Sequence, residues 1–205
     1  MRIIDLEQGS EKWLQYRKTH VMGTDAAVIL GENKYVSRKL LWQRKWDLVP
    51  PEQENEKMRR GKDLEEPARK LLIEKTGINF KPMCVEHNDH EWLSCSLDGL
   101  SDCKRFICEI KAGSEDLHNF TLSGEVKHIY FIQVQHQLLV TGCDKCYFAS
   151  YRPEYMEKPL AIIEILPDYE KMAELFEAER IFYEVNMKQF IAPEDYTLEL
   201  KENRS

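Results

Sequence analysis

The chain has 205 residues, of which 42% are hydrophobic and 32% charged, and its formal net charge is −7. This length is sufficient for one domain with a full hydrophobic core, and the acidic balance argues against a simple basic nucleic-acid-binding protein. No apolar run approaches membrane-spanning length, and the charged start of the chain predicts that it has no signal peptide. The six cysteines are therefore expected to be reduced thiols in the cytoplasm.

The charges are unevenly distributed along the chain. Residues 1–62 contain 13 Lys and Arg against 9 Asp and Glu, a balance of +4, whereas the remainder contains 16 against 27, a balance of −11. A basic N-terminal part is suited to face phosphates, and an acidic remainder would face away from them. For any single Lys or Arg, the simpler interpretation is an ordinary solvated surface charge.

Three short helices are predicted in the N-terminal part. The first covers 10–18, where Ser10 can cap it, and Ser37 can cap the third. The second is a short apolar helix that follows Asp25 and can end at Gly31.

A long helix is predicted over 58–76, ending at Gly77. Its apolar stripe follows the spacing i, i+4, i+7, i+8 and consists of Leu64, Ala68, Leu71 and Leu72. Glu65 lies on the flank of this stripe, where its simplest role is a surface charge paired with Arg69 at i+4.

The rest of the chain alternates strands and helices. The predicted elements are strands at 79–86, 91–98 and 105–111, a helix at 126–141, strands at 145–152 and 160–166, and a helix from Asp168. The dipeptide Asp98-Gly99 is interpreted as a turn between strands. This order predicts an α/β or α+β domain with a small mixed sheet flanked by helices.

The most informative residues are Asp98 and the segment Glu109-Ile110-Lys111. Side chains alternate along a strand, so Glu109 and Lys111 point to one face, and Asp98 is near them if the two strands are neighbours. Two carboxylates provide oxygen ligands for Mg²⁺, and the lysine can orient or deprotonate a water. The alternative is a solvated hairpin edge with an exposed ion pair.

Other candidate sites have simpler interpretations. Cys143-Asp144-Lys145-Cys146 has the spacing of a zinc or redox site, but no second such pair exists, which favours buried or turn thiols. The stretch His87-Asn88-Asp89-His90 resembles a polar turn, and His136 is expected to pack or to form a neutral hydrogen bond. Trp42 and Trp46 are expected in the core, with a base-stacking role as the alternative.

Six short motifs occur in one order: Gln8-Gly9-Ser10-x-x-Trp13-x-x-x-Arg17, Val21-Met22-Gly23-Thr24-Asp25-Ala26, Gly61-Lys62-x-x-Glu65, Ser96-Leu97-Asp98-Gly99-Leu100, Glu109-Ile110-Lys111 and Gln133-Val134-Gln135-His136-Gln137. Together they resemble the PD-(D/E)xK nucleases, and more closely the family of lambda exonuclease and YqaJ-like viral recombinases. The resemblance implies one nuclease domain over 1–205 with a restriction-endonuclease-like fold. Its parts would be a helical region at 1–57, a catalytic core at 58–152 and a C-terminal strand and helix at 153–205.

The resemblance also implies roles for the acidic residues. Asp98 and Glu109 would bind metal together with the main-chain carbonyl of Ile110. Lys111 would position and activate the attacking water. Glu65 would join this cluster through water or metal. Three clustered carboxylates repel one another without a cation, so a fold that holds them together is expected to bind metal.

Three further residues take roles by the same resemblance. Gln133 would orient the nucleophile or a phosphate, and Arg17 would contact the 5′-phosphate of the substrate. Thr24 stands where the family often has a serine hydroxyl in that phosphate pocket. The sequence departs from the family at Thr24 and at Leu97, which replaces the proline of the PD motif.

The activity that the resemblance implies is a Mg²⁺-dependent exonuclease, with Mn²⁺ as a substitute, acting on double-stranded DNA ends. It would degrade the 5′-ended strand from 5′ to 3′, release mononucleotides and leave a 3′ single strand for a single-strand annealing protein. Relatives imply a homotrimeric ring, encoded by a phage or prophage and active in the bacterial cytoplasm. The alternatives are a dimeric endonuclease of the same fold and a non-catalytic DNA-end-binding scaffold.

Overall fold

A six-stranded mixed sheet forms the centre of the computed structural model, which describes residues 1–51 and 53–193. The strands follow the chain order across the sheet, and all neighbours are antiparallel except β4 and β5. They are β1 (Arg2–Ile4), β2 (Phe80–Glu86), β3 (Ser94–Ser101), β4 (Phe106–Lys111), β5 (Lys145–Tyr151) and β6 (Leu160–Ile165). This α+β fold with a small mixed sheet is the fold that the sequence predicts. Of the C-terminal part expected at 153–205, residues 194–205 lie outside the described residues.

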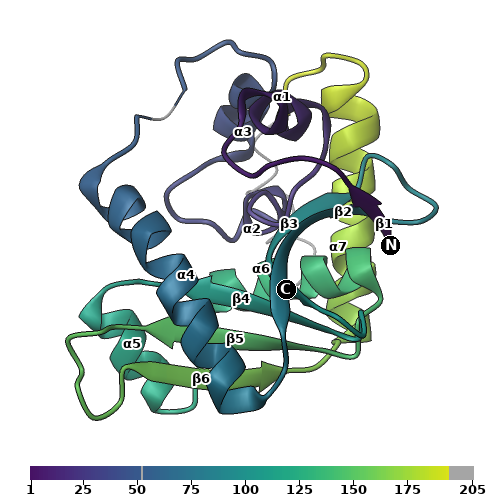
Figure 1. Cartoon of the computed structure of the whole chain (residues 1–205). Helices are drawn as coiled ribbons and strands as arrows, with labels where there is room; N and C mark the ends of the chain where they lie inside the picture. The colour runs from purple at the N-terminus through teal and green to yellow at the C-terminus, as the bar shows by residue number, and fades with distance from the viewer. Residues whose placement is uncertain (52, 194–205) are drawn as a thin grey trace, which may run out of the picture.

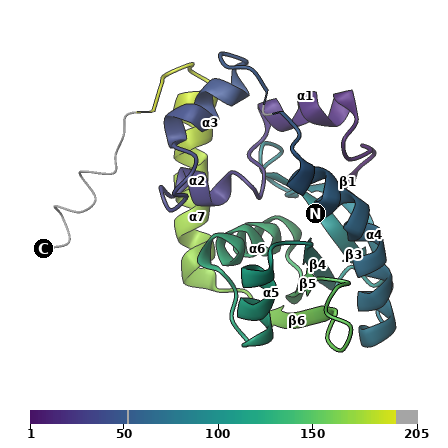
Figure 2. The ribbon, with the colours of Figure 1, turned by 90° about the vertical axis from the view of Figure 1, so that its left-hand side faces the viewer.

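Helices cover both faces of this sheet (Figures 1 and 2). They are α1 (Glu11–Thr19), α2 (Ala26–Ile29), α3 (Arg38–Lys45), α4 (Glu56–Thr76), α5 (Glu115–Leu122), α6 (His128–Thr141) and α7 (Tyr169–Ile181), the last continuing as a π-helix over Phe182–Met187. Within the described part of the chain, no helix is long and apolar enough to cross a membrane.

Two hydrophobic cores lie on opposite faces of the sheet. On one face, Leu72 of α4 packs in a cluster with Ile110 of β4. On the other, Leu138 of α6 packs in a larger cluster with Ile107 of β4 and Leu97 of β3. Because side chains alternate along β4, the residues on either side of Ile110 face α6.

The helix signals in the sequence are confirmed. The Ser10 and Ser37 hydroxyls each accept a hydrogen bond from the backbone N–H three residues ahead, at 3.2 Å. Gly77 and Gly142 end α4 and α6 with φ of 69° and 66°, a left-handed conformation that glycine adopts without steric penalty.

The predicted turn at Asp98-Gly99 is wrong, because both residues lie inside β3. A Cβ atom at Gly99 would be 2.6 Å from the Cys108 Sγ atom and 2.7 Å from the Phe80 Cβ atom. Glycine is therefore present because the neighbouring strands approach closely, and not because the chain turns. The turn between β3 and β4 comes later, where Lys104 has a φ of 56°.

Two elements were not predicted from the sequence. β1 spans three residues and is held to β2 by pairing and by an ion pair between Arg2 and Glu86 at 2.7 Å. So short a strand has no periodic signal of its own. By contrast, α5 did have local signals, since Ser114 caps it and Glu115 occupies its first turn.

A fully buried pair, His136 on α6 and Glu179 on α7, joins these two helices to the sheet. His136 Nδ1 lies 2.7 Å from the Glu179 Oε1 atom, and His136 Nε2 lies 2.9 Å from the Ser94 carbonyl oxygen. Both ring nitrogens thus face acceptors. Burial opposes the charged ring, but Glu179, the Ser94 carbonyl and, more weakly, Asp25 outweigh it and raise the pKa of His136. His136 therefore packs in the core, as the sequence predicts, and its two acceptors and raised pKa favour an ion pair with Glu179 over a neutral hydrogen bond.

This pair predicts a pH-dependent stability. Because the folded pKa of His136 lies above its ordinary value of 6.5, the stabilisation is complete below pH 6.5 and is lost as the pH rises through the folded pKa. One proton contributes a slope of about 1.4 kcal/mol per pH unit in that window. Urea unfolding between pH 6 and pH 9 measures it. A His136→Gln/Glu179→Gln variant should lose this part of the slope, and an unchanged slope contradicts the assignment.

Candidate active site

Glu109 and Lys111 lie on the face of β4 that α6 covers, as strand alternation predicts. The Lys111 ammonium forms an ion pair with the Glu109 Oε1 atom. Glu109 is 2% exposed and the Lys111 side chain is 23% exposed, so the carboxylate is buried and the ammonium is mostly covered. The alternative interpretation as an exposed ion pair on a hairpin edge is therefore excluded.

Two glutamines of α6 hold the Glu109 carboxylate. Gln133 Nε2 donates to the Glu109 Oε1 atom at 2.8 Å, and Gln137 Nε2 donates to the Oε2 atom at 2.6 Å. The Gln133 Oε1 atom also accepts from Lys111 Nζ at 3.4 Å. Gln133 is expected here from the sequence, whereas the contact of Gln137 was not predicted, although the spacing i, i+4 places both on one side of the helix.

Asp98 lies at a fork between β3 and β4. The paired residues of these strands are Gly99 with Cys108 and Leu100 with Ile107. Next to the last pair, the Asp98 Oδ2 atom accepts the Ile110 N–H at 2.7 Å. The Asp98 side chain thus takes the place of a ladder hydrogen bond and lies beside the Glu109-Ile110-Lys111 segment.

The electrostatics of this fork are unusual. Burial raises the pKa of Asp98 well above its ordinary range, and the Glu109 charge raises it further, with a smaller contribution from Glu65. Burial alone would lower the pKa of Lys111, but the charges of Glu109 and Asp98 outweigh it and raise that pKa. Lys111 is therefore a protonated hydrogen-bond donor at neutral pH, suited to orient a water or to stabilise a phosphate oxygen.

Glu65 lies on α4, across the sheet from α6. Its carboxylate accepts from Arg69 at 2.8 Å, the local pair that its i, i+4 spacing predicts. Arg69 also donates to the Asp98 carbonyl oxygen at 2.7 Å, which fixes α4 to the fork. Arg69 was not recognised from the sequence as part of this site.

The oxygen donors at the fork bear on whether it can bind a divalent cation. Among the described residues, no three His, Cys, Asp or Glu side chains form a ready metal-binding group. Mg²⁺, however, commonly binds one or two carboxylates and completes its shell with water and phosphate. Asp98, Glu109 and the Ile110 carbonyl are hard oxygen donors, and a cation would offset both effects that raise the pKa of Asp98, which are burial and, second, the Glu109 charge. These residues fit Mg²⁺.

The cysteine pair has a different environment. Cys143 and Cys146 are both buried free thiols, and the Cys143 Sγ atom donates to the Lys104 carbonyl at 3.4 Å. This agrees with the interpretation of the pair as buried thiols.

Trp42 is buried, while Trp46 is 38% exposed and contacts Phe190 edge to face.

Arg17 and Thr24 lie together, as the phosphate-pocket interpretation requires. The Arg17 guanidinium donates to the Thr24 Oγ1 atom at 2.9 Å and lies over the Trp13 ring, 4.5 Å from its centroid. Asp25, which could have paired with Arg17, instead accepts from Lys45 at 2.6 Å. A guanidinium beside a hydroxyl can bind a phosphate through several charge-assisted hydrogen bonds.

The N-terminal motif connects this pocket to the fork. The Gln8 side-chain amide donates to the Leu97 carbonyl at 3.0 Å, and the Trp13 indole donates to the Ser96 hydroxyl at 2.7 Å. A Cβ atom on Gly23 would lie 3.5 Å from the Gln133 Cγ atom, so the segment before Thr24 packs directly on α6. The motifs that are separate in sequence therefore surround one region.

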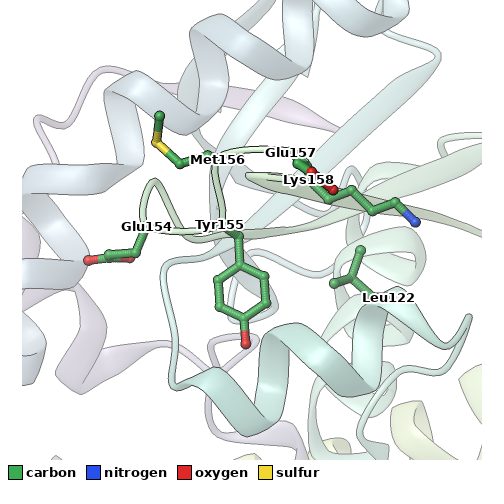
Figure 3. Close-up of a pocket in the computed structure, with 6 residues that line it drawn as sticks. All are labelled: Leu122, Glu154, Tyr155, Met156, Glu157 and Lys158. Carbon is green, nitrogen blue, oxygen red and sulfur yellow. The ribbon is translucent and has the colours of Figure 1, made fainter.

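An open pocket of about 430 Å³ lies elsewhere, between α5 and the loop before β6 (Figure 3). It is lined by Leu122, Glu154, Tyr155, Met156, Glu157 and Lys158. None of the candidate site residues lines this pocket, so it is separate from the candidate active site.

Comparison with known proteins gives a family and relatives. The model of the YqaJ-like viral recombinase domain matches residues 12–144. The uncharacterized protein YqaJ of Bacillus subtilis (strain 168) is 30% identical over 148 residues, which cover 70% of this chain and 46% of that protein. The uncharacterized protein R354 of Acanthamoeba polyphaga mimivirus is 27% identical over 161 residues, covering 72% of this chain and 29% of that protein. The chain thus spans less than half the length of these relatives.

Solved structures share the fold. LHK-Exo in complex with dAMP has a TM-score of 0.77 at 24% identity and covers 96% of this chain and 100% of its own. An alkaline exonuclease (LHK-Exo) from Laribacter hongkongensis gives 0.76 at 23% identity, covering 95% and 99%. A phage-related exonuclease from Haemophilus somnus 129PT gives 0.63 at 18% identity, covering 84% and 96%. At these identities the likeness shows the fold, and it confirms the fold predicted from the sequence.

Proposed function

The chain belongs to the YqaJ-like viral recombinase domain family, and from this premise we propose that it is a DNA exonuclease that hydrolyses phosphodiester bonds. The observation that carries the proposal is the convergence of Asp98, Glu109 and Lys111 at the fork between β3 and β4. One buried carboxylate, Glu109, and one half-buried carboxylate, Asp98, with a protonated lysine beside them are suited to stabilise the charge that develops on a phosphate.

The finer proposal is a Mg²⁺-dependent reaction that starts at a duplex end and proceeds from 5′ to 3′. It is supported by the position of the Arg17–Thr24 pair, whose segment packs on the helix that holds Glu109. Such a reaction releases mononucleotides and leaves a 3′ single strand. LHK-Exo was crystallised with dAMP, a mononucleotide of the kind that this reaction would release.

The residues of the chain would divide the work as follows. A cation bound by Asp98, Glu109 and the Ile110 carbonyl would neutralise phosphate charge and make a bound water more acidic. Lys111 would donate to the attacking water or to a phosphate oxygen, while Gln133 keeps its orientation relative to Glu109. Glu65 would contribute charge from α4, through water.

The phosphate pocket would supply the preference for ends. Arg17 would bind the 5′-phosphate, with Thr24 as a second donor, and neither residue would read a base. Contacts of this kind position the nucleic acid without sequence selectivity.

One assay with four substrates tests the proposed activity. Linear duplexes labelled at a 5′-phosphate or a 5′-hydroxyl end, a nicked circle and a supercoiled circle are incubated with Mg²⁺ or Mn²⁺. We expect loss of mononucleotides from the 5′ ends of linear DNA and an intact closed circle. Cleavage of the closed circle would identify the dimeric endonuclease, and end binding without cleavage would identify the scaffold.

Arg17 predicts a measurable preference between the two linear substrates. A hydrogen bond to a charged group contributes roughly 1.5–3 kcal/mol, which corresponds to a rate ratio of about tenfold or more. The 5′-phosphate duplex should therefore be degraded faster, and Arg17→Ala should remove most of the difference. If Arg17 serves only stability, wild-type protein will degrade both ends at one rate.

For assembly and partners, we propose a homotrimeric ring that passes its 3′ strand to a single-strand annealing protein in the bacterial cytoplasm, from a phage or prophage gene. The support is the family and the contrast between the basic residues 1–62 and the acidic remainder, which suits a positive inner surface. Mass photometry that detects only monomer at micromolar concentration contradicts the ring.

A further inference from the structure

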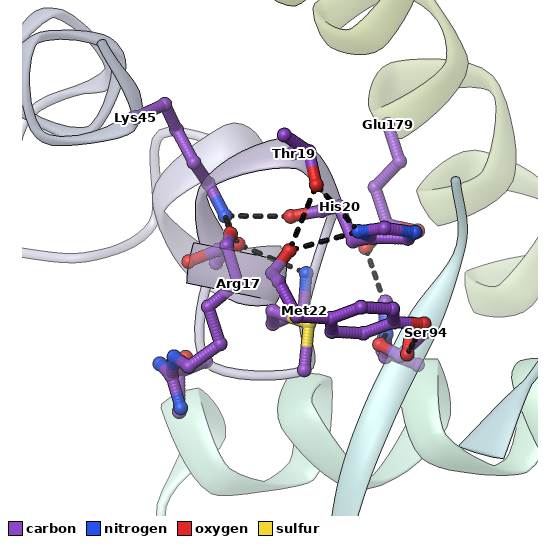
Figure 4. Close-up of polar contacts among 11 residues, drawn as sticks. Arg17, Thr19, His20, Met22, Lys45, Ser94 and Glu179 are labelled. Atoms are coloured by element: carbon purple, nitrogen blue, oxygen red, sulfur yellow. Dashed lines mark hydrogen bonds and ion pairs between the residues drawn. The ribbon is translucent and has the colours of Figure 1, made fainter. Parts of the chain in front are cut away.

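Lys45, the last residue of α3, is a buried cation that the proposed mechanism does not use. Its side chain is 6% exposed. The ammonium donates to the Arg17 carbonyl at 2.6 Å, to the His20 carbonyl at 2.7 Å and to the Asp25 Oδ2 atom at 2.6 Å (Figure 4). These three acceptors use all three N–H groups of the lysine.

The three acceptors lie on both sides of the phosphate pocket. The Arg17 carbonyl belongs to the last turns of α1, and Asp25 is the N-cap of α2. The Asp25 Oδ2 atom also accepts the Met22 N–H at 2.9 Å, so the same carboxylate orders the segment that leads to Thr24. Lys45 therefore links the backbone of Arg17 to the backbone next to Thr24.

The two pocket side chains meet at the far end of the Arg17 side chain. The Arg17 guanidinium reaches the Thr24 hydroxyl at 2.9 Å, while the Arg17 side chain extends away from Lys45 (Figure 4). The position of the guanidinium is set by its backbone at one end and by the Trp13 ring at the other. A shift of the α1 end relative to α2 would separate Arg17 from Thr24.

A lysine is an expensive way to fill this space. Burial lowers the pKa of Lys45, and Asp25 opposes this effect, while the nearby Arg17 charge adds to the lowering. An apolar side chain would avoid the cost of removing an ammonium from water. It would, however, take away one hydrogen-bond donor from two carbonyl groups and from the Asp25 carboxylate. The ammonium also adds a second positive charge close to Arg17, which favours an anion in the pocket.

We propose that Lys45 is a positioning residue that holds Arg17 and Thr24 in register and thereby sets the preference of the enzyme for 5′-phosphate ends. The inference rests on the proposed function and assigns a specificity role to a residue that contacts no substrate. It differs from a purely structural role, which would alter the handling of all DNA ends equally.

The test compares Lys45→Met with wild type on duplexes that carry a 5′-phosphate or a 5′-hydroxyl. The ratio of kcat/KM for the two substrates is expected to fall about tenfold, since a displacement near 1 Å can reduce rates up to about 100-fold. The rate on the hydroxyl end should change little. The same ratio is measured as equilibrium affinity by fluorescence anisotropy in EDTA, which does not depend on catalysis.

Lys18→Met is the matched control. Lys18 is adjacent to Arg17 and also ties α1 to the end of α3, through Asp47 at 2.8 Å, but this pair is more exposed and does not touch the Arg17 carbonyl. Its ratio should equal that of wild type. Equal losses in Lys18→Met and Lys45→Met would show that any loosening of α1 is sufficient, and would overturn the inference.

A double variant, Lys45→Met/Asp25→Asn, covers the case in which Lys45→Met folds poorly because the buried Asp25 carboxylate has lost its cationic partner and keeps only the Met22 N–H. A ratio that stays low in a folded double variant supports positioning, whereas a restored ratio means that Lys45 only neutralises Asp25. A wild-type ratio near one, in rate and in affinity, also overturns the inference. Absence of any cleavage by wild type overturns the proposed function instead, and the affinity ratio in EDTA still decides the role of Lys45.

Discussion

Lys111→Ala is expected to reduce the rate of phosphodiester cleavage by about 1,000-fold, the effect of removing a preorganised charged donor. The Lys111 ammonium contacts both Glu109 and Gln133, and its raised pKa keeps it protonated at neutral pH. Affinity for duplex ends should remain largely intact, because the Arg17–Thr24 pair is untouched. Single-turnover cleavage and anisotropy binding, measured on the same labelled duplex, separate the two effects.

Lys145→Ala is the matched control for this variant. Lys145 is also a strand lysine, on β5, and pairs with Glu164 of β6 at 2.7 Å, away from the fork. Its rate should equal that of wild type. Wild-type turnover in Lys111→Ala would contradict the assignment of the site.

Asp98→Asn and Glu109→Gln are each expected to lose most divalent-cation affinity and about 1,000-fold or more in rate, because each removes an anionic oxygen ligand. In the absence of metal, Asp98→Asn is expected to make the folded protein more stable. The folded pKa of Asp98 lies well above its ordinary value of 3.8, so its charged form destabilises the fold at neutral pH, and the neutral amide should raise the melting temperature in EDTA.

Calorimetric titration with Mg²⁺ and thermal melts with and without EDTA measure these two effects. Asp102→Asn is the control, since Asp102 follows β3 and pairs with Lys81 on the surface at 2.9 Å. If Asp98→Asn bound Mg²⁺ as wild type does, the carboxylates would not be the metal ligands. If Asp98→Asn lowered stability in EDTA, the destabilisation inferred from the raised pKa of Asp98 would be wrong.

The part of the fold that was predictable depended on local chemistry. The caps at Ser10 and Ser37 and the glycine ends at Gly77 and Gly142 involve residues within about one helical turn, so the sequence contains the whole signal. The same holds for Glu109 and Lys111, whose shared face follows from strand geometry alone. Their metal and catalytic roles came from the resemblance and stay predictions.

The error at Asp98-Gly99 has a different origin. An Asp-Gly pair is a common turn signal, but here a neighbouring strand and the Phe80 side chain approach so closely that only glycine fits. Close packing of this kind depends on residues far apart in sequence. The same tertiary arrangement places the Asp98 carboxylate against the Ile110 N–H, where β3 and β4 diverge.

Neighbouring residues alone specify the helix boundaries marked by caps, the alternation of β4 and the order of the motifs. By contrast, the contact of Gln137 with Glu109 and that of Lys45 with the Arg17 backbone become evident only in the folded chain. Each of these contacts joins residues 28 positions apart. A polar side chain has several possible partners until packing removes water, and burial then leaves only the acceptors that the folded chain brings within reach.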